Sequence, residues 1–367
     1  MAFNKQEFTV FNDSRINEKI NCDLKYIKKT LLQEFSGIHS MVLVGGFGRG
    51  EGSVLLEGNN IIPVNDYDIV LIAYKKIDKN KINKIRKQLA KDLGIWWVDI
   101  SVYLISQMRV LPYTMYVYDF KYGGYVFFGD KSILKYIPDM NSERMPLVES
   151  ELLCFTRLWC FLGAFKEDFL QRVLSDKEKF FLMYQLSKAI CAVIDTKLIL
   201  NKAYHYSYVK KIDIFQEIYS NEEELIELSN FAIDFKLKPY KKMDTDLIEM
   251  YFRVKDIFIK EMFQFVCKMY KKNFSDWDDY VKTYLITFKV LVKRFVSLFM
   301  GRTKSLCNRN YVNLAQLYLV ASLKKDSVDC HLLKKAVNML SKIEGKDLSS
   351  LSWEKARTLV VDLRMKV

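Results

Sequence analysis

The spacing of apolar residues predicts two regions of different architecture. Up to about residue 140, short apolar runs typical of buried strands alternate with stretches whose apolar residues recur at helical spacing. Beyond Pro146 only the helical spacing continues, and Pro138 and Pro146 mark the boundary. The pattern therefore predicts an α+β fold: a mixed sheet with flanking helices in residues 1–140, followed by an α-helical domain in residues 146–367.

In the first region, strands and helices alternate along the chain. The lysine-rich stretch Asp78–Leu93 is amphipathic, and Gly94 after it is a typical helix C-cap. Two β-prone runs flank Gly123-Gly124 within Met115–Phe128, which predicts a hairpin. The other elements expected here are a helix over Asp13–Phe35 and strands over Met41–Val44, Ile69–Ile72 and Trp96–Ile105.

The helices predicted in the second region follow one another without a repeat of fixed period. They are expected over Leu147–Phe165, Asp176–Leu200, Asn221–Phe235, Asp244–Tyr270, Asp276–Met300, Tyr311–Leu323, Val328–Ile343 and Ser350–Met365. Tyr204, His205, Tyr206 and Tyr208 follow the second of these helices. Their aromatic rings are expected either to pack against a neighbouring helix or to form a platform for an acceptor sugar or base.

The strongest chemical signal lies between the strands predicted at Met41–Val44 and Ile69–Ile72. Glycines at positions 45, 46, 48, 50 and 52 directly follow the first strand. A turn of this kind lets backbone N–H groups approach an anion such as a phosphate. Asp66 and Asp68 stand at i and i+2 at the start of the next strand, so their carboxylates project from one face and can converge on a cation.

A third carboxylate, Asp99, lies on the strand predicted over Trp96–Ile105. A strand–helix–strand connection brings this strand back beside the one that carries Asp66 and Asp68. Taken alone, a glycine-rich stretch is more often a plain turn, an Asp-x-Asp pair a solvated strand end, and an aspartate such as Asp99 a surface residue. Their occurrence together, in this order, indicates a site where Mg²⁺ assists attack on a nucleoside triphosphate (NTP).

At these residues the chain resembles the nucleotidyltransferase superfamily that includes DNA polymerase β. The resemblance covers roughly the first third of the chain, and for the rest it implies only a helical bundle beside the acceptor cleft. It implies that Gly45, Gly46 and Arg49 contact the NTP phosphates. It also implies that Asp66, Asp68 and Asp99 bind Mg²⁺, or Mn²⁺ in its place, while Asp99 helps to deprotonate the acceptor. The segment between Gly46 and Asp66 is longer than is usual in the family, which predicts an added loop near the site.

The activity implied is transfer of a nucleoside monophosphate from an NTP to a hydroxyl-bearing acceptor, with release of pyrophosphate. A small molecule or a protein is favoured as acceptor, because no recognisable RNA-binding module is present and the helical half has no clear basic–aromatic strip. The alternatives are an RNA-directed or cyclic-nucleotide-forming transferase of the same fold, and a catalytically weak nucleotide-binding or antitoxin-like module. A non-enzymatic helical scaffold is the least favoured of the possibilities.

Composition narrows these expectations further. The formal net charge of +13 favours polyanionic ligands such as triphosphates, and nucleic acid stays possible but not favoured.

The cysteines have no zinc-type spacing and the start of the chain resembles no secretory signal, which together predict reduced thiols and a cytoplasmic protein. His39, His205 and His331 are too far apart for a histidine-based site. The longest apolar stretch, from Leu285, is interrupted by charges, so no membrane insertion is expected.

Overall fold

The computed structural model describes residues 7–11, 13–58, 60–64, 66–240, 246–296 and 303–366. The chain divides into two compact units. One comprises Met1–Pro146 and Asn201–Tyr240, and the other comprises Leu147–Leu200 and Lys241–Val367. The segment Asn201–Tyr240 thus groups with the sheet, whereas the sequence pattern places it in the helical domain.

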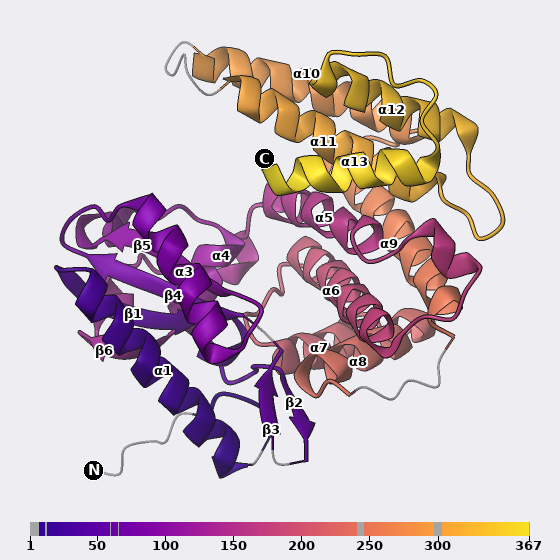
Figure 1. Ribbon diagram of the computed structural model, residues 1–367. Coiled ribbons are helices and arrows are strands. Elements are labelled where there is room, and N and C mark those ends of the chain that lie inside the picture. The colour runs from indigo at the N-terminus through magenta and orange to yellow at the C-terminus, as the bar shows by residue number, and fades with distance from the viewer. Residues whose placement is uncertain are drawn as a thin grey trace. The chain divides into compact units, whose positions relative to one another are not determined.

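A four-stranded mixed sheet, in the order β5-β4-β1-β6, forms the centre of the first unit (Figure 1). β1 (Ile38–Val44) is antiparallel to both β4 (Tyr67–Ala73) and β6 (Tyr125–Gly129). β4 is parallel to β5 (Val98–Leu104). The mixed sheet and the helices around it confirm the α+β class and the strands expected from the apolar runs.

Two helices, α1 (Ser14–Glu34) and α3 (Lys79–Leu93), cover one face of this sheet (Figure 1). Asp13 caps the first turn of α1, and Gly94 ends α3 with a left-handed backbone at φ +67°, so both predicted helices are confirmed. The core between helices and sheet contains Ile16, Ile20, Leu24, Ile27, Leu31, Ile82, Ile85, Leu89, Leu43, Tyr67, Ile69, Leu71, Val98 and Ile100. Because neighbouring residues of a strand point to opposite faces, Asp68 and Asp99 lie on the other face.

The hairpin predicted around Gly123-Gly124 is wrong. Its first half is a helix, α4 (Met115–Gly123), whose first turn is capped by the Thr114 hydroxyl. Only its second half is a strand, β6. The β-prone residues fold as a helix because Val117 and Phe120 lie at helical spacing and are buried, so tertiary packing overrides local preference. Gly124 is needed for close packing, since a Cβ there would lie 2.5 Å from the Phe120 carbonyl oxygen.

The added segment between Gly52 and Asp66 is also more ordered than predicted. Instead of an irregular loop it contains the antiparallel pair β2 (Val54–Glu57) and β3 (Asn60–Pro63). Val54 and Pro63 face each other in this pair and are both buried. The extra length therefore forms a small second sheet.

Two helices in Asn201–Tyr240 complete the first unit. Helix α8 (Glu223–Leu237) confirms the helix predicted over Asn221–Phe235. Helix α7 (Tyr208–Ile218) was not predicted, although Ser207, whose hydroxyl accepts a hydrogen bond from the backbone N–H of Lys210, is a recognisable N-cap.

Apart from an isolated bridge between Leu323 and Val328, the regular structure described in the second unit is helical. The predicted helices correspond to α5 (Leu147–Leu162), α6 (Asp176–Leu200), α9 (Leu247–Tyr270), α10 (Trp277–Val296), α11 (Thr303–Ser322), α12 (Cys330–Glu344) and α13 (Trp353–Lys366). The start of the helix predicted over Asp244–Tyr270 and the end of that over Asp276–Met300 lie outside the described residues. Short 3₁₀ helices are η1 (Ile105–Val110), η2 (Ile133–Tyr136) and η3 (Ser142–Arg144) in the first unit and η4 (Glu167–Leu170) in the second.

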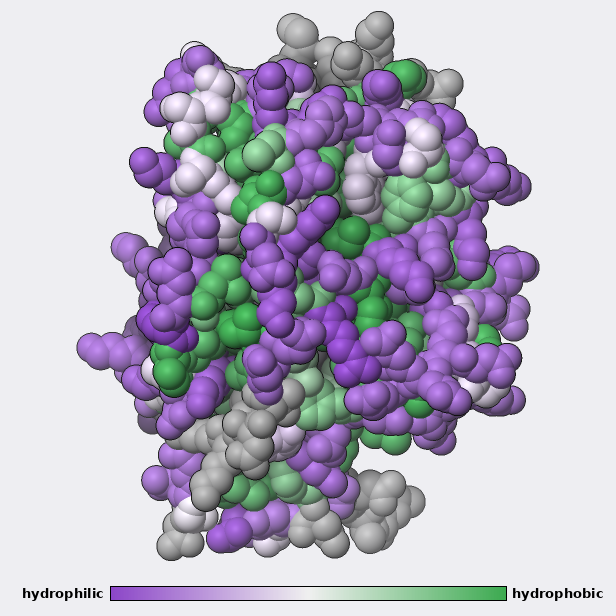
Figure 2. Space-filling view, turned by 90° about the vertical axis from the view of Figure 1, so that its right-hand side faces the viewer, coloured by the Kyte–Doolittle hydropathy of each residue, from purple (hydrophilic) through white to green (hydrophobic). Residues whose placement is uncertain are grey.

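The molecular face in Figure 2 is mostly hydrophilic, with hydrophobic residues in small groups. None of the helices in the described part of the chain is long and apolar enough to cross a bilayer.

Candidate functional site

The aspartates found in the sequence lie at the same end of two neighbouring strands. β4 and β5 run parallel, and Asp68 is the direct register partner of Asp99. Asp66 lies just before β4 and is exposed, while Asp68 is partly buried. The three aspartates therefore lie at the amino-terminal ends of these two strands, with Asp66 and Asp99 within electrostatic reach of Asp68.

These carboxylates act on one another electrostatically. Burial, and after it the negative charges of Asp66 and Asp99, raise the pKa of Asp68 to about 7. The positive charges of Arg49 and Lys236 oppose this rise. The amino-terminal ends of β4 and β5 thus concentrate negative charge, and a bound cation would reduce the repulsion between the carboxylates.

Two side chains near the aspartates were not anticipated. Arg86 on α3 forms an ion pair with Asp99 at 3.0 Å. Tyr116, at the start of α4, is the second. Burial raises the pKa of its hydroxyl, and Asp68 and Asp99 both contribute to the rise. The Tyr116 hydroxyl therefore lies within electrostatic reach of the carboxylates.

The glycine turn lies directly against Asp68. Gly45 begins the short helical turn α2 (Gly45–Gly48) with φ +65°, a conformation that side chains other than glycine rarely adopt. A Cβ on Gly45 would fall 2.1 Å from Oδ2 of Asp68. The carbonyl oxygen of Gly46 accepts a hydrogen bond of 2.8 Å from the backbone N–H of Glu51. Turn and carboxylate are thus packed together without an intervening side chain.

Arg49, predicted to contact phosphate, has its side chain only 8% exposed and bound within the protein. Its Nε donates a hydrogen bond to Glu51 at 2.9 Å, and its guanidinium lies 3.7 Å from the Asp119 carboxylate and 4.5 Å above the Tyr208 ring. Burial acts to lower the pKa of Arg49, but Tyr208, Asp119 and Glu51 outweigh it and the pKa is raised. The guanidinium is therefore firmly charged and held by internal partners.

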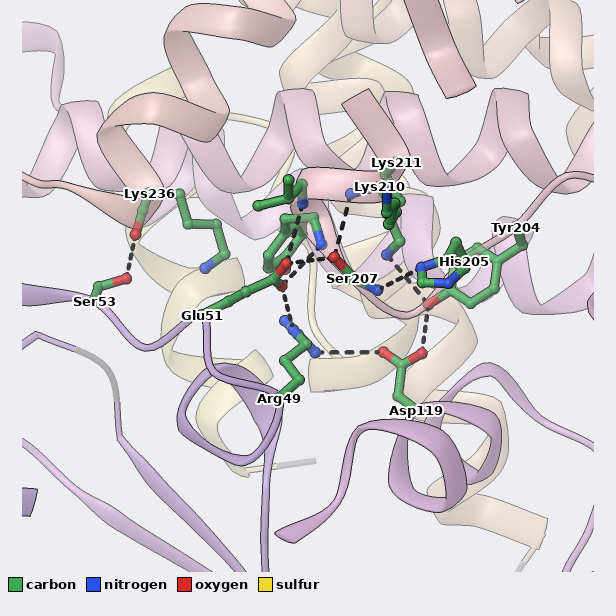
Figure 3. A network of polar contacts seen from close by, with 12 residues as sticks. Arg49, Glu51, Ser53, Asp119, Tyr204, His205, Ser207, Lys210, Lys211 and Lys236 are labelled. Atoms are coloured by element: carbon green, nitrogen blue, oxygen red, sulfur yellow. Dashed lines mark hydrogen bonds and ion pairs between the residues drawn. The ribbon is translucent and has the colours of Figure 1, made fainter. Parts of the chain in front are cut away.

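Glu51 connects the glycine turn to α7, across 156 residues of sequence (Figure 3). Its carboxylate accepts hydrogen bonds from the Ser207 hydroxyl at 2.6 Å and from the backbone N–H groups of Tyr208 at 2.8 Å and Val209 at 3.1 Å. With Arg49 these make four donors on a carboxylate that is 5% exposed. Glu51 thus serves as a cap for the first turn of α7, where a negative charge is stabilised.

The tyrosines that follow α6 take different positions. Tyr204 is buried, and its hydroxyl donates a hydrogen bond to Asp119 at 2.9 Å, which favours packing over an acceptor platform. Tyr206 stacks on His205 with ring centroids 4.5 Å apart. Tyr208 is surrounded by the cations of Arg49, Lys211 and Lys236. Nothing in the local sequence identified Asp119, Lys211 or Lys236 as part of this cluster.

The donor chemistry of the aspartates fits Mg²⁺ or Mn²⁺, which prefer carboxylate oxygen. The pKa of Asp68 is raised first by burial and then by the negative charges of Asp66 and Asp99, which a bound cation would offset. Among the residues that the structure describes, however, no group of three or more His, Cys, Asp and Glu side chains lies close enough to form a ready ligand cage. Asp66 and Asp68, at i and i+2 at the start of β4, are the pair best suited to hold such an ion, and Asp99 forms an ion pair with Arg86.

A cavity of about 450 Å³ lies elsewhere in the first unit, with no aspartate in its lining. It is lined by Lys19, Asn60, Ile61, Ile62, Pro63, Leu93 and Gly94. It is therefore not part of the candidate site.

The chain matches no protein-family model and no curated protein sequence.

Proposed function

We propose that this chain is a nucleotidyltransferase that transfers a nucleoside monophosphate from an NTP to an acceptor hydroxyl and releases pyrophosphate. The observation that carries the proposal is the contact between Gly45 and Asp68. It lies at the amino-terminal ends of β4 and β5, beside Asp66 and Asp99. A turn suited to phosphate and a group of carboxylates suited to a divalent cation are adjacent there, as this reaction requires.

In this proposal the backbone N–H groups of Gly45 and Gly46 bind phosphate oxygens, and Asp66 and Asp68 hold the divalent cation. When bound, Mg²⁺ neutralises phosphate charge and polarises the phosphorus–oxygen bonds. Asp99, oriented by Arg86, accepts the proton of the acceptor hydroxyl. The acceptor oxygen bonds to the α-phosphorus while the bond from that phosphorus to the bridging oxygen breaks, and pyrophosphate leaves.

We infer that the acceptor is a small molecule or a protein and that the protein acts in the cytoplasm. The described cysteines Cys22, Cys154, Cys160, Cys191, Cys267 and Cys330 are all free thiols, which fits a reducing compartment. Mn²⁺ is expected to substitute for Mg²⁺, because both prefer oxygen ligands.

The test uses purified protein, Mg²⁺ and each of the four NTPs labelled at the α-phosphate, with and without a cell extract. Label in a new product identifies the base, and mass spectrometry of that product identifies the acceptor. Asp66→Asn and Asp68→Asn are expected to abolish the product, because each removes a cation ligand.

Asp213→Asn is the matched control. It changes an exposed aspartate on α7 of the same unit that lies 3.8 Å from the ammonium group of Lys210. This variant is expected to retain full activity. NTP binding without any labelled product would instead favour a nucleotide-binding module, and a labelled product formed equally by wild type and both Asn variants would refute the site.

A further inference from the structure

The exposed side chains of α3 are of only two kinds. Between residues 79 and 91 they are lysines (Lys79, Lys84, Lys87 and Lys91) and neutral amides (Asn80, Asn83 and Gln88). No acidic residue occurs between Asp78 and Asp92. The apolar side chains of the helix, Ile82, Ile85 and Leu89, are buried in the core. We call the surface formed by these lysines and amides the lysine face.

The charge of the lysine face is not neutralised within the protein. Lys84, Lys87 and Lys91 stand at i, i+3 and i+7, so their ammonium groups project from one side of the helix. In the part of the chain that the structure describes, neither these three lysines nor Lys79 forms an ion pair. Like charges at these spacings repel one another and destabilise a helix, so an anionic ligand would be stabilising here.

Helix α1 extends this basic surface. Tyr26 on α1 donates a hydrogen bond to Asp92 at 2.8 Å. At the other end of the pair, Lys81 on α3 forms an ion pair with Glu34 at 3.1 Å. The two helices therefore run antiparallel and side by side. The exposed Lys29 of α1 lies on the length of helix between these two contacts, beside the lysines of α3.

Most of the excess charge of the chain lies in this surface. Helix α1 and residues 74–93 contain thirteen Lys and Arg but only five Asp and Glu. They therefore hold +8 of the formal net charge of +13 in about one ninth of the chain. Among the five carboxylates, Asp23 is buried beside Lys19, and Asp78 caps the first turn of α3. A surface with so large an excess of cations attracts polyanions.

The side chains of the lysine face favour one kind of polyanion. Helices that bind at a membrane surface insert apolar side chains, and proteins that bind single-stranded nucleic acid stack bases on aromatic rings. The lysine face exposes neither. Its ammonium and amide groups are instead donors to phosphate and sugar oxygens. From Lys79 to Lys91 the helix rises by about 18 Å, a length over which a duplex carries about ten phosphates.

We propose that the lysine face, extended by α1, binds the phosphate backbone of a nucleic acid duplex without reading its sequence. Helix α3 covers the face of the sheet opposite to that of Asp68 and Asp99, so the duplex is a binding partner and not the acceptor of the proposed transfer. RNA and DNA duplexes offer the same phosphate chemistry, and only RNA adds 2′-hydroxyl groups. The inference does not depend on the proposed function.

The test measures binding by fluorescence anisotropy. The probes are an RNA duplex and a DNA duplex of the same sequence, each of about 20 base pairs and so longer than the lysine face. Wild type is compared with the triple variant Lys84→Gln/Lys87→Gln/Lys91→Gln. Glutamine and lysine have nearly the same helix propensity, so α3 should still form, and thermal unfolding checks this.

The matched control removes the same charge elsewhere in the first unit. It is the triple variant Lys135→Gln/Lys210→Gln/Lys238→Gln, in which three exposed lysines outside α1 and α3 are changed. A response of binding to net charge alone would be the same in both triple variants. A response to the lysine face would appear only in the first.

We expect wild type to bind both duplexes with an affinity that falls steeply between about 50 and about 200 mM salt. The α3 variant should bind about tenfold more weakly or worse. It should also lower the slope of log Kd against log salt by about 3, one for each lost phosphate contact. The control variant should change Kd by less than about twofold. Tighter binding of the RNA duplex assigns contacts to 2′-hydroxyl groups, and equal binding assigns the backbone alone.

Three results would overturn the inference. They are no binding of either duplex by wild type, an equal loss in the two triple variants, and tighter binding to vesicles that contain phosphatidylserine than to either duplex. The last would identify a membrane surface as the partner. The proposed transferase is tested separately, because duplex binding lost in the α3 variant of a protein that makes no labelled product leaves this inference standing.

Discussion

Gly45 and Asp68 are in such close contact that no side chain fits between them: a Cβ on Gly45 would lie 2.1 Å from Oδ2 of Asp68. The strand register explains this contact, because Val44, the last residue of β1, pairs with Asp68 on β4. The turn therefore begins beside the carboxylate. A ligand held by the backbone of this turn is held next to the aspartates.

Gly45→Ala should reduce nucleotidyl transfer by about 100-fold, because the new methyl group displaces the Asp68 carboxylate from its position. The left-handed backbone at this position, φ +65°, should add about 1 kcal/mol or more of destabilisation. Initial transfer rates and urea unfolding measure the two effects.

Gly94→Ala is the control for backbone strain. Gly94 has nearly the same conformation, φ +67°, but a Cβ there would meet nothing within 4 Å. The Gly94→Ala variant should lose about as much free energy of unfolding as backbone strain removes from Gly45→Ala, and it should keep its activity. Equal activity of the two alanine variants would show that the contact with Asp68 has no role in transfer.

Asp68→Asn should abolish transfer and at the same time stabilise the protein. Burial and two neighbouring carboxylates raise the pKa of Asp68 to about 7, so above that pH an ionised Asp68 opposes folding. The amide removes this charge, and we expect a gain of roughly 1–3 kcal/mol in the free energy of unfolding at pH 8. Urea unfolding measures it, and a loss of stability would contradict the electrostatic account of the site.

Glu51→Ala should destabilise the first unit by about 3 kcal/mol, because it leaves Arg49 and the first turn of α7 without their buried carboxylate. Glu51→Gln should cost less, since the amide oxygen still accepts hydrogen bonds. Hydrogen exchange should show faster opening at the amides of Tyr208 and Val209. Glu217→Ala, at an exposed position on the same helix, should have no such effect.

In the second unit, Glu151 should make stability fall with rising pH. Burial raises its pKa, although Tyr270 and Tyr280 donate hydrogen bonds to it at 3.1 and 2.8 Å and act in the opposite sense. The folded state therefore holds the proton more tightly than the unfolded state. The stability that protonated Glu151 contributes is fully present below the pKa of Glu151 in the unfolded state. It is lost as the pH rises through the pKa of Glu151 in the folded state.

Glu151→Gln keeps an acceptor oxygen for both tyrosines and removes the charge. Its Tm should exceed that of wild type at neutral pH, and the difference should shrink as the pH is lowered toward the unfolded pKa of a glutamate. Tm measured across this pH range by scanning calorimetry tests the point. A difference that does not vary with pH would show that Glu151 is ionised in neither state or in both alike.

The arrangement of Asp66, Asp68 and Asp99 could be predicted because it depends on local patterns. Apolar runs define β4 and β5, and the helix between them begins after Asp78 and ends at Gly94, both of which are local signals. Two parallel strands joined by such a helix bring their equivalent ends together. The side-chain partners of Arg49 could not be predicted in this way.

Those partners come from distant parts of the chain. Asp119 lies on α4, which local preference misassigns to a hairpin, and Tyr208 lies on α7, more than 150 residues after Glu51. A buried ion pair leaves no periodic signal, since each partner is a single charged residue among many. The same holds for Lys236, one of many lysines in a basic chain.

The stoichiometry of the products tests the central proposal most directly. Wild-type protein with Mg²⁺, an α-labelled NTP and its acceptor should release one pyrophosphate for each labelled product, and Asp68→Asn should yield neither. Release of orthophosphate in place of pyrophosphate, or a labelled product from Asp68→Asn at the wild-type rate, would contradict nucleotidyl transfer at this site.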